Sequence, residues 1–230
     1  MIAHRGANRE HPENTMPAFL RALEVGADGI ELDVHCTRDG VVVVHHDAAV
    51  HATSMVGTLR ERSIDALSYE ELSNFATAER EIIPTLGAVL GEVGARAEVF
   101  VELKGREIED KVLDVIAASP APDHCPIHSF DHEAVKRARR HVPLLRTGIL
   151  VERRAVDAAA ILAAAEAEDF WAHWTIIDER LVTQVHGFSR QSRVIAWTVN
   201  DAQCARRLSS YGVDGLCTDD VPFLRQALSE

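Results

Sequence analysis

Short apolar strands and amphipathic helices alternate along nearly the whole chain, and this alternation limits the available folds more than any other feature. Strands are predicted at eight places, namely 1–4, 29–35, 98–104, 125–130, 144–150, 173–177, 193–199 and 215–219. Helical periodicity covers 13–25, 84–93, 107–118, 131–141, 154–167, 178–186, 201–209 and 221–228. Eight such units in 230 residues predict an α/β protein, a (β/α)8 TIM-type barrel. A doubly wound open sheet also alternates in this way, and periodicity does not exclude it.

One region departs from the alternation. Residues 39–47, DGVVVVHHD, start with an Asp-Gly turn signal and predict an extra strand in a hairpin-like excursion. Residues 48–83 then run without a clear core strand, with one short helix expected at 69–76. We therefore expect a single domain over 1–230, with a short insertion at 48–83 after the second strand.

Charge and composition narrow the classes of partner. The formal net charge of −12 argues against general binding to nucleic acid or anionic membranes, because both need basic patches. A small anionic substrate remains possible where local cations outweigh the global field. The chain is 47% hydrophobic, which predicts a globular core, and it has no run of 18 apolar residues that would predict a membrane span.

The cysteines and the first residues bear on location. Cys36, Cys125, Cys204 and Cys217 show no CxxC or other metal-finger spacing, so we expect reduced thiols. The first residues, MIAH, already resemble a strand that leads into a catalytic loop, which leaves no room for a signal peptide. We expect a cytoplasmic protein without stable membrane insertion.

Polar side chains recur where the predicted strands end. A barrel has its active site at the C-terminal ends of its strands. The residues at these ends are His4, Arg5, Glu31, Asp33, Glu102, Lys104, His128, Ser129, Trp197, Asn200 and Asp219. A barrel with a purely structural role does not need this pattern.

Spacing groups the acidic residues. Residues i and i+2 of a strand face the same side, roughly 6.6 Å apart, so Glu31 and Asp33 point together. Glu102 and Lys104 do the same on the next barrel strand. The three carboxylates predict a site for one hard divalent cation, Mg²⁺ or Ca²⁺ rather than zinc.

Two histidines bracket the first acidic pair in the sequence. The imidazoles of His4 and His46 can donate and accept protons near neutral pH. Arg5, beside the first histidine, is available to an anion. Each feature has a structural alternative: a single histidine after a strand, a solvated face or a surface ion pair. Their joint occurrence at successive strand ends favours a catalytic site.

Several segments resemble a known family. They are AHRG (3–6), ENT (13–15), GIELDVHCTRDGVVVVHHD (29–47), IPTL (83–86), VELK (101–104), HSFD (128–131), AWTVN (196–200) and GLCTD (215–219). Together they resemble the glycerophosphodiester phosphodiesterase family over nearly the whole chain. The resemblance implies a TIM-type barrel with an insertion of variable size after the second strand. It also implies hydrolysis of substrates such as glycerophosphocholine or glycerophosphoethanolamine to glycerol 3-phosphate and an alcohol.

The resemblance implies roles for individual residues. The family's metal ligands correspond to Glu31, Asp33 and Glu102, which would hold one divalent cation, Mg²⁺ or Ca²⁺. Its catalytic histidines correspond to His4 and His46, one acting as general base and the other as general acid.

Three further residues correspond to the substrate side of the family's pocket. Arg5 and Lys104 are expected to contact the phosphate, and Trp197 to line the pocket. His46 is preferred over His45 because the family's histidine directly precedes an aspartate, and alternating strand residues cannot easily aim both at one site.

The chain also departs from the family pattern. The sequence TDDVP places Pro222 one step late, which weakens the assignment of Asp219. A structural role is expected for His128, an N-cap of the first helix for Asn14, and for Glu13 an orienting contact near the metal.

Two alternative functions remain open. A phospholipase D-like activity on lysophospholipids needs an apolar surface near the mouth, and 48–83 has only scattered apolar residues. A non-catalytic binding barrel is disfavoured by the intact histidines and carboxylates. The expected partner is a small glycerophosphodiester.

Overall fold

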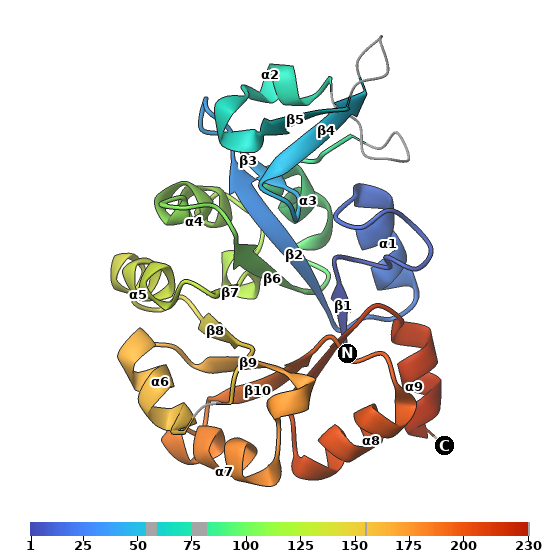
Figure 1. Cartoon of the computed structure of the whole chain (residues 1–230), viewed down its shortest axis with the longest axis vertical. Helices are drawn as coiled ribbons and strands as arrows, with labels where there is room; N and C mark the ends of the chain where they lie inside the picture. The colour runs from blue at the N-terminus through green and yellow to red at the C-terminus, as the bar shows by residue number, and fades with distance from the viewer. Residues whose placement is uncertain (54–58, 75–81, 155, 230) are drawn as a thin grey trace.

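Eight parallel strands close into a barrel in the computed structural model, which describes residues 1–53, 59–74, 82–154 and 156–229 (Figure 1). Around the barrel the strands are β1 (Ile2–His4), β2 (Gly29–Cys36), β6 (Glu98–Leu103), β7 (Ile127–Ser129), β8 (Thr147–Val151), β9 (Asp169–His173), β10 (Arg193–Trp197) and β11 (Gly215–Thr218). Strand β1 pairs with both β2 and β11, which closes the sheet. The predicted (β/α)8 barrel is confirmed, and the open sheet is excluded.

Helices surround the barrel. They are α1 (Met16–Glu24), α3 (Leu86–Val93), α4 (Glu109–Ala117), α5 (His132–His141), α6 (Ala158–Ala165), α7 (Glu179–Phe188), α8 (Ala202–Tyr211) and α9 (Val221–Ser229). Carboxylate side chains cap several of them; Asp178, for example, accepts a hydrogen bond from the Leu181 N–H. The expected cap at Asn14 is wrong, because Thr15 is the N-cap of α1.

The apolar core has an outer and an inner part. Most buried side chains lie in two clusters that include residues of both the strands and the helices. A smaller cluster, which lies on barrel strands only, includes Phe100 and Trp171, whose rings meet edge to face 5.1 Å apart. Gly148 makes room for this packing, since a Cβ there would lie 2.9 Å from Trp171 Cδ1. Large side chains therefore fill the barrel below its polar mouth.

The sixth barrel strand differs from the expectation. Strand β9 covers Asp169–His173, whereas 173–177 was predicted. Trp174–Ile176 forms the short 3-10 helix η3, and a second such turn, η2, covers Pro122–His124. The apolar run from Phe170 to Ile177 is longer than the strand, so hydrophobicity alone did not locate the paired residues.

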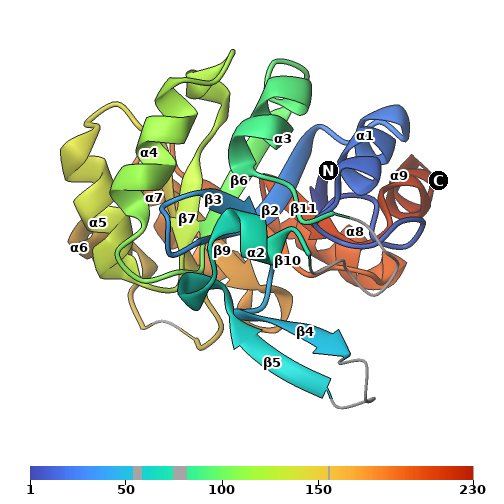
Figure 2. The ribbon, with the colours of Figure 1, turned by 90° about the horizontal axis from the view of Figure 1, so that it is seen from above.

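The segments Ala49–Thr53 and Leu59–Ser63 project away from the barrel (Figure 2). Strand β3 (Val42–Val44) pairs antiparallel with β2, which matches the predicted hairpin-like excursion. Strands β4 (Ala49–Thr53) and β5 (Leu59–Ser63) form a separate two-stranded sheet that the sequence did not reveal. The turn η1 (Ile64–Ala66) and the helix α2 (Tyr69–Leu72) follow. The last two residues of the expected helix 69–76 lie outside the described residues.

Among the described residues, no helix has the length and apolar character needed to cross a membrane.

Candidate active site

Strand register brings the predicted site residues together at the barrel mouth. His4 on β1 is in register with Glu31 on β2. Asp33 is in register with Glu102 on β6, and Glu102 with His128 on β7. Residues that are separated by up to 124 positions thus lie on four neighbouring strands at one end of the barrel.

The loop after β1 has an unusual backbone. Arg5 and Gly6 have φ of 57° and 84°, both in the left-handed region. Gly6 also has no space for a side chain, because a Cβ would lie 2.8 Å from Ala18 Cβ. This turn directs the Arg5 N–H to Glu31 Oε2, at 3.2 Å. The glycine of the His-Arg-Gly sequence therefore shapes the site through its backbone.

His4 is held by a carboxylate from the far end of the chain. Its Nδ1 lies 2.7 Å from Asp219 Oδ1. Asn8 and Asn200 donate to the same carboxylate at 2.7 Å and 2.6 Å. Burial would raise the pKa of Asp219, but the hydrogen bonds from His4 and Asn8 lower it well below its usual range. Because an ionised carboxylate only accepts, His4 Nδ1 donates the shared proton, and Nε2 is left for proton transfer.

We expect Asp219→Asn to lower kcat by roughly 10²-fold, because the amide no longer fixes the tautomer and orientation of His4. The variant should also lose part of its sensitivity to acid. A carboxylate whose pKa is depressed by folding contributes stability that is complete above about pH 4 and is lost as the pH falls below that. Kinetics at pH 7 and acid unfolding curves test both parts; an unchanged kcat would contradict the orienting role.

Asp33 is enclosed by polar groups. It is 1% exposed, and its Oδ2 accepts a hydrogen bond from Asn14 Nδ2 at 2.8 Å. Arg5 Nε lies 3.1 Å from Oδ2, and Lys104 Nζ lies 3.8 Å from Oδ1. Burial would raise the pKa of Asp33, but Arg5, Asn14 and Lys104 lower it. Its Oδ1 has no hydrogen-bond partner among the described residues. Asn14 thus binds Asp33, and Glu13 accepts from Arg5 Nη1 at 2.9 Å.

Ionisation of the other two carboxylates, Glu31 and Glu102, is unfavourable in this buried cluster. Burial raises the pKa of Glu31 well above its usual range, and repulsion from the charges of Asp33 and Glu102 adds to this effect. Burial and the charge of Asp33 raise the pKa of Glu102 to about 7, although Lys104 Nζ lies 3.2 Å from its Oε1. Buried carboxylates of this kind are stabilised in the ionised form by a nearby cation.

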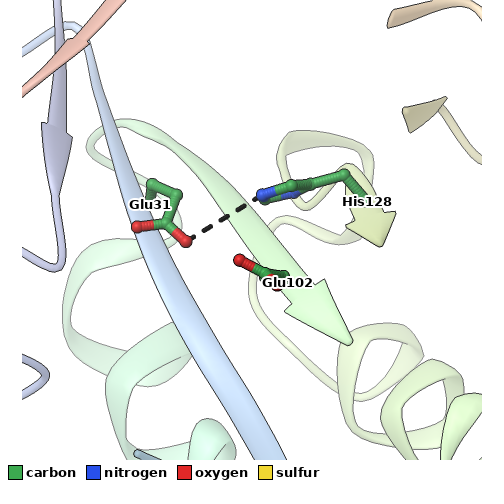
Figure 3. Close-up of side chains that lie close together, drawn as sticks. All are labelled: Glu31, Glu102 and His128. Carbon is green, nitrogen blue, oxygen red and sulfur yellow. Dashed lines mark ion pairs between the residues drawn. The ribbon is translucent and has the colours of Figure 1, made fainter. Parts of the chain in front are cut away.

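His128 completes this cluster. One ligand atom each from Glu31, Glu102 and His128 lie within 4.8 Å of one another, and Figure 3 shows the imidazole directed at the two carboxylates. Burial lowers the pKa of His128 to about 3, so its ring is neutral. The ring stacks on Trp171 with centroids 4.2 Å apart.

His46 and His45 follow β3 and differ in their surroundings. His46 lines the mouth, and its Nδ1 lies 2.8 Å from Asp47 Oδ1. The backbone N–H of His45 donates to Asp33 O at 3.0 Å, and burial lowers the pKa of its imidazole. His35 Nε2 lies 3.1 Å from His46 O and supports this loop.

Most of these side chains line one cavity of about 230 Å³. Seven of the eight predicted site residues line it, namely His4, Arg5, Glu31, His46, Glu102, Lys104 and Trp197. Asp33 lies beneath them and does not line it. The remaining lining residues include Phe130 and Glu152. Two imidazoles, cationic side chains and a carboxylate cluster around one cavity can bind an anion and transfer protons.

Some contributors were not identified from the sequence. Asn8 gave no pattern beyond its nearness to His4. His128 and Asn200 did stand at predicted strand ends, so their position was the available signal. Asp219 was assigned weakly because of the shifted proline, yet it contacts His4 directly.

Comparisons with known proteins identify the family of this chain. A sequence model described as the glycerophosphoryl diester phosphodiesterase family matches residues 4–222. The glycerophosphodiester phosphodiesterase of Caldanaerobacter subterraneus subsp. tengcongensis is 32% identical, and the match covers 97% of this chain and 95% of that protein.

Solved structures show the same fold. A glycerophosphodiester phosphodiesterase from Thermotoga maritima has a TM-score of 0.81 at 25% identity, covering 98% of this chain and 96% of that one. A phosphodiesterase from Oleispira antarctica, solved with the product sn-glycerol-3-phosphate, has a TM-score of 0.87 at 24% identity, covering 100% and 96%.

Proposed function

The chain belongs to the glycerophosphoryl diester phosphodiesterase family and is a phosphoric diester hydrolase, and from this premise we propose its substrates and mechanism. We propose that it hydrolyses glycerophosphodiesters, such as glycerophosphocholine and glycerophosphoethanolamine, to glycerol 3-phosphate and an alcohol. The observation that carries this proposal is the single cavity lined by His4, His46, Arg5 and the carboxylate cluster.

One divalent cation would bind Glu31, Asp33 and Glu102. Two observations indicate that these residues suit a cation. The buried Asp33 Oδ1 lacks a hydrogen-bond partner among the described residues, and the pKa values of Glu31 and Glu102 are raised. Carboxylate oxygen alone suits Mg²⁺ or Ca²⁺. When bound, the cation supplies Lewis acidity toward a phosphate oxygen and a glycerol hydroxyl.

Charge balance supports the same assignment. When all three carboxylates are ionised, their charges exceed those of Arg5 and Lys104, which contact them, by one negative unit. A divalent cation reverses this local charge to one positive unit. A phosphodiester carries one negative charge, so the loaded site is complementary to its substrate.

The two histidines move protons. Each has its Nδ1 beside a carboxylate, Asp219 for His4 and Asp47 for His46, so each presents Nε2 for proton transfer. One takes the proton of the nucleophile, a glycerol hydroxyl or a water molecule. The other protonates the leaving alcohol. If the glycerol hydroxyl attacks first, a cyclic phosphate forms, and the two imidazoles exchange roles in its hydrolysis.

Aromatic and acidic groups at the rim suit a cationic head group. Phe130 and Trp197 meet edge to face 5.6 Å apart, and both line the cavity with Glu152. Ring faces and a carboxylate attract ammonium groups.

A substrate panel tests the proposal. Purified protein should release glycerol 3-phosphate from glycerophosphocholine and glycerophosphoethanolamine, and EDTA should lower the rate by roughly 10²-fold or more. Addition of a divalent cation should restore it. A rate unaffected by EDTA would contradict the cation site. Conversion of lysophosphatidylcholine to lysophosphatidic acid, in preference to these substrates, would favour the phospholipase D-like alternative.

A matched pair of variants tests the choice of histidine. We expect His46→Asn to lower kcat by roughly 10²- to 10⁴-fold, because a proton-transfer group is lost. His45→Asn should lower it less than about 10-fold, since His45 is not among the residues that line the cavity. Equal losses in steady-state kinetics would overturn the assignment of His46.

Two organisational proposals remain. We propose a cytoplasmic location, supported by four free thiols, as a reducing compartment maintains them. We also propose one domain over 1–230, with 48–83 as an insertion that carries its own sheet.

A further inference from the structure

The buried imidazole of His128 has no task in the chemistry described above, although it points at two of its carboxylates (Figure 3). Its Nε2 lies 3.9 Å from Glu31 Oε1. Glu31, Glu102 and His128 each offer one ligand atom to a group whose atoms lie within 4.8 Å of one another. Two atoms that each lie about 2.1–2.3 Å from one ion are roughly 3 to 4.5 Å apart. The nitrogen is therefore placed as a ligand would be, after small side-chain adjustments.

The hydrogen bonding of His128 is incomplete within the described part of the chain. The residue is 1% exposed, and its Nδ1 has no hydrogen-bond partner there. The 3.9 Å separation from Glu31 is too long for a hydrogen bond from Nε2. Within the described residues the ring is therefore not held by a full set of hydrogen bonds. A bound cation would give Nε2 a partner on the side that faces Glu31.

Packing fixes the direction of the ring. His128 and Trp171 are nearly parallel, with 5° between their planes. Trp171 in turn packs against Phe100 and occupies the space that the absence of a side chain at Gly148 leaves free. Packing inside the barrel thus sets the orientation of the His128 ring, as supporting contacts do for the ligands of a metal.

We propose that His128 Nε2 is a further ligand of the cation, beside oxygens of Glu31, Asp33 and Glu102. This inference rests on the proposed cation site and deepens it. Imidazole nitrogen favours transition-metal ions, whereas Mg²⁺ and Ca²⁺ favour oxygen. The mixed nitrogen–oxygen set makes the site select Mn²⁺ over Mg²⁺ and Ca²⁺. A cluster of carboxylates alone would not discriminate in this way.

Pulsed electron paramagnetic resonance on the full chain with one equivalent of Mn²⁺ tests the proposal without any turnover. We expect a nitrogen coupling typical of a metal-bound imidazole. His128→Gln should abolish the coupling and weaken Mn²⁺ binding at least about 10-fold, while Ca²⁺ binding changes less than about 3-fold. The control His132→Gln removes a nearby imidazole whose Nε2 lies 3.1 Å from Leu150 O, and it should leave both unchanged.

The outcomes separate this inference from the proposed function. Mn²⁺ binding without a nitrogen coupling would overturn the role of His128 and leave an oxygen-only site. If the chain binds none of Mn²⁺, Mg²⁺ and Ca²⁺, the cation site itself fails. Should His128→Gln not fold, a variant with His4→Gln and His46→Gln replaces it. A coupling that persists there supports His128, and its loss overturns the assignment.

Discussion

Glu31→Gln should abolish most activity, lowering kcat/KM by roughly 10³-fold, because a cation that stabilises the transition state contributes several kcal/mol. The substitution keeps the size of the side chain and an oxygen that can accept from the Arg5 N–H. It removes one negative charge from the buried cluster. We therefore expect weaker cation binding as the cause, which a metal titration beside the kinetics would measure.

The same variant should be more stable than the parent without metal. Folding raises the pKa of Glu31, and a buried carboxylate with a raised pKa destabilises the folded state once it is ionised. At pH 7 the neutral amide avoids this cost, so the melting temperature of the metal-free protein should rise. Glu10→Gln is the control, since Glu10 is partly exposed and pairs with Arg21. Full activity in Glu31→Gln, or equal losses in both variants, would remove Glu31 from the site.

Asp169→Ala should destabilise the protein by about 3–5 kcal/mol, the usual result of removing one partner of a buried ion pair. Asp169 begins β9 at the end of the barrel opposite the mouth, and it is 1% exposed. Arg193 Nη2 donates to its Oδ2 at 2.7 Å, and Arg146 Nη2 to its Oδ1 at 2.5 Å. Arg193 also donates to both oxygens of Glu98 at 3.0 Å. Loss of the aspartate leaves two guanidinium groups short of negative charge.

Urea unfolding at pH 7 measures this effect. Glu24→Ala is the matched control, because Glu24 is 63% exposed and pairs with Arg21 on the surface of α1. It should cost no more than about 0.5 kcal/mol. Activity of folded Asp169→Ala should stay near that of the parent, since the mouth is distant. A loss of stability no larger than that of the control would mean that the arginines find other partners.

The local sequence pattern predicted much of the barrel and many of the residues at its mouth. The i, i+2 spacing of Glu31 and Asp33 depends only on strand geometry, and their positions at predicted strand ends place His4, Glu102 and Lys104 at the same mouth. The local pattern did not predict the limits of every strand or which strands pair. The β9 run was apolar on both sides of His173, so its paired residues depended on β8 and β10. The hairpin of β4 and β5 has charged residues, such as Glu61 and Arg62, and did not resemble a core strand.

By itself, then, the sequence determined the period of the fold, the residues that carry charge at the strand ends, and the family. Only the tertiary structure decided how these residues are paired. Asp219 reaches His4 across 215 positions, and His128 rather than Asp33 shares the cluster of ligand atoms with Glu31 and Glu102. The physical reason is that periodicity tells which face of its own strand a residue occupies. The register between strands and the rotamers that packing selects exist only once the barrel has closed.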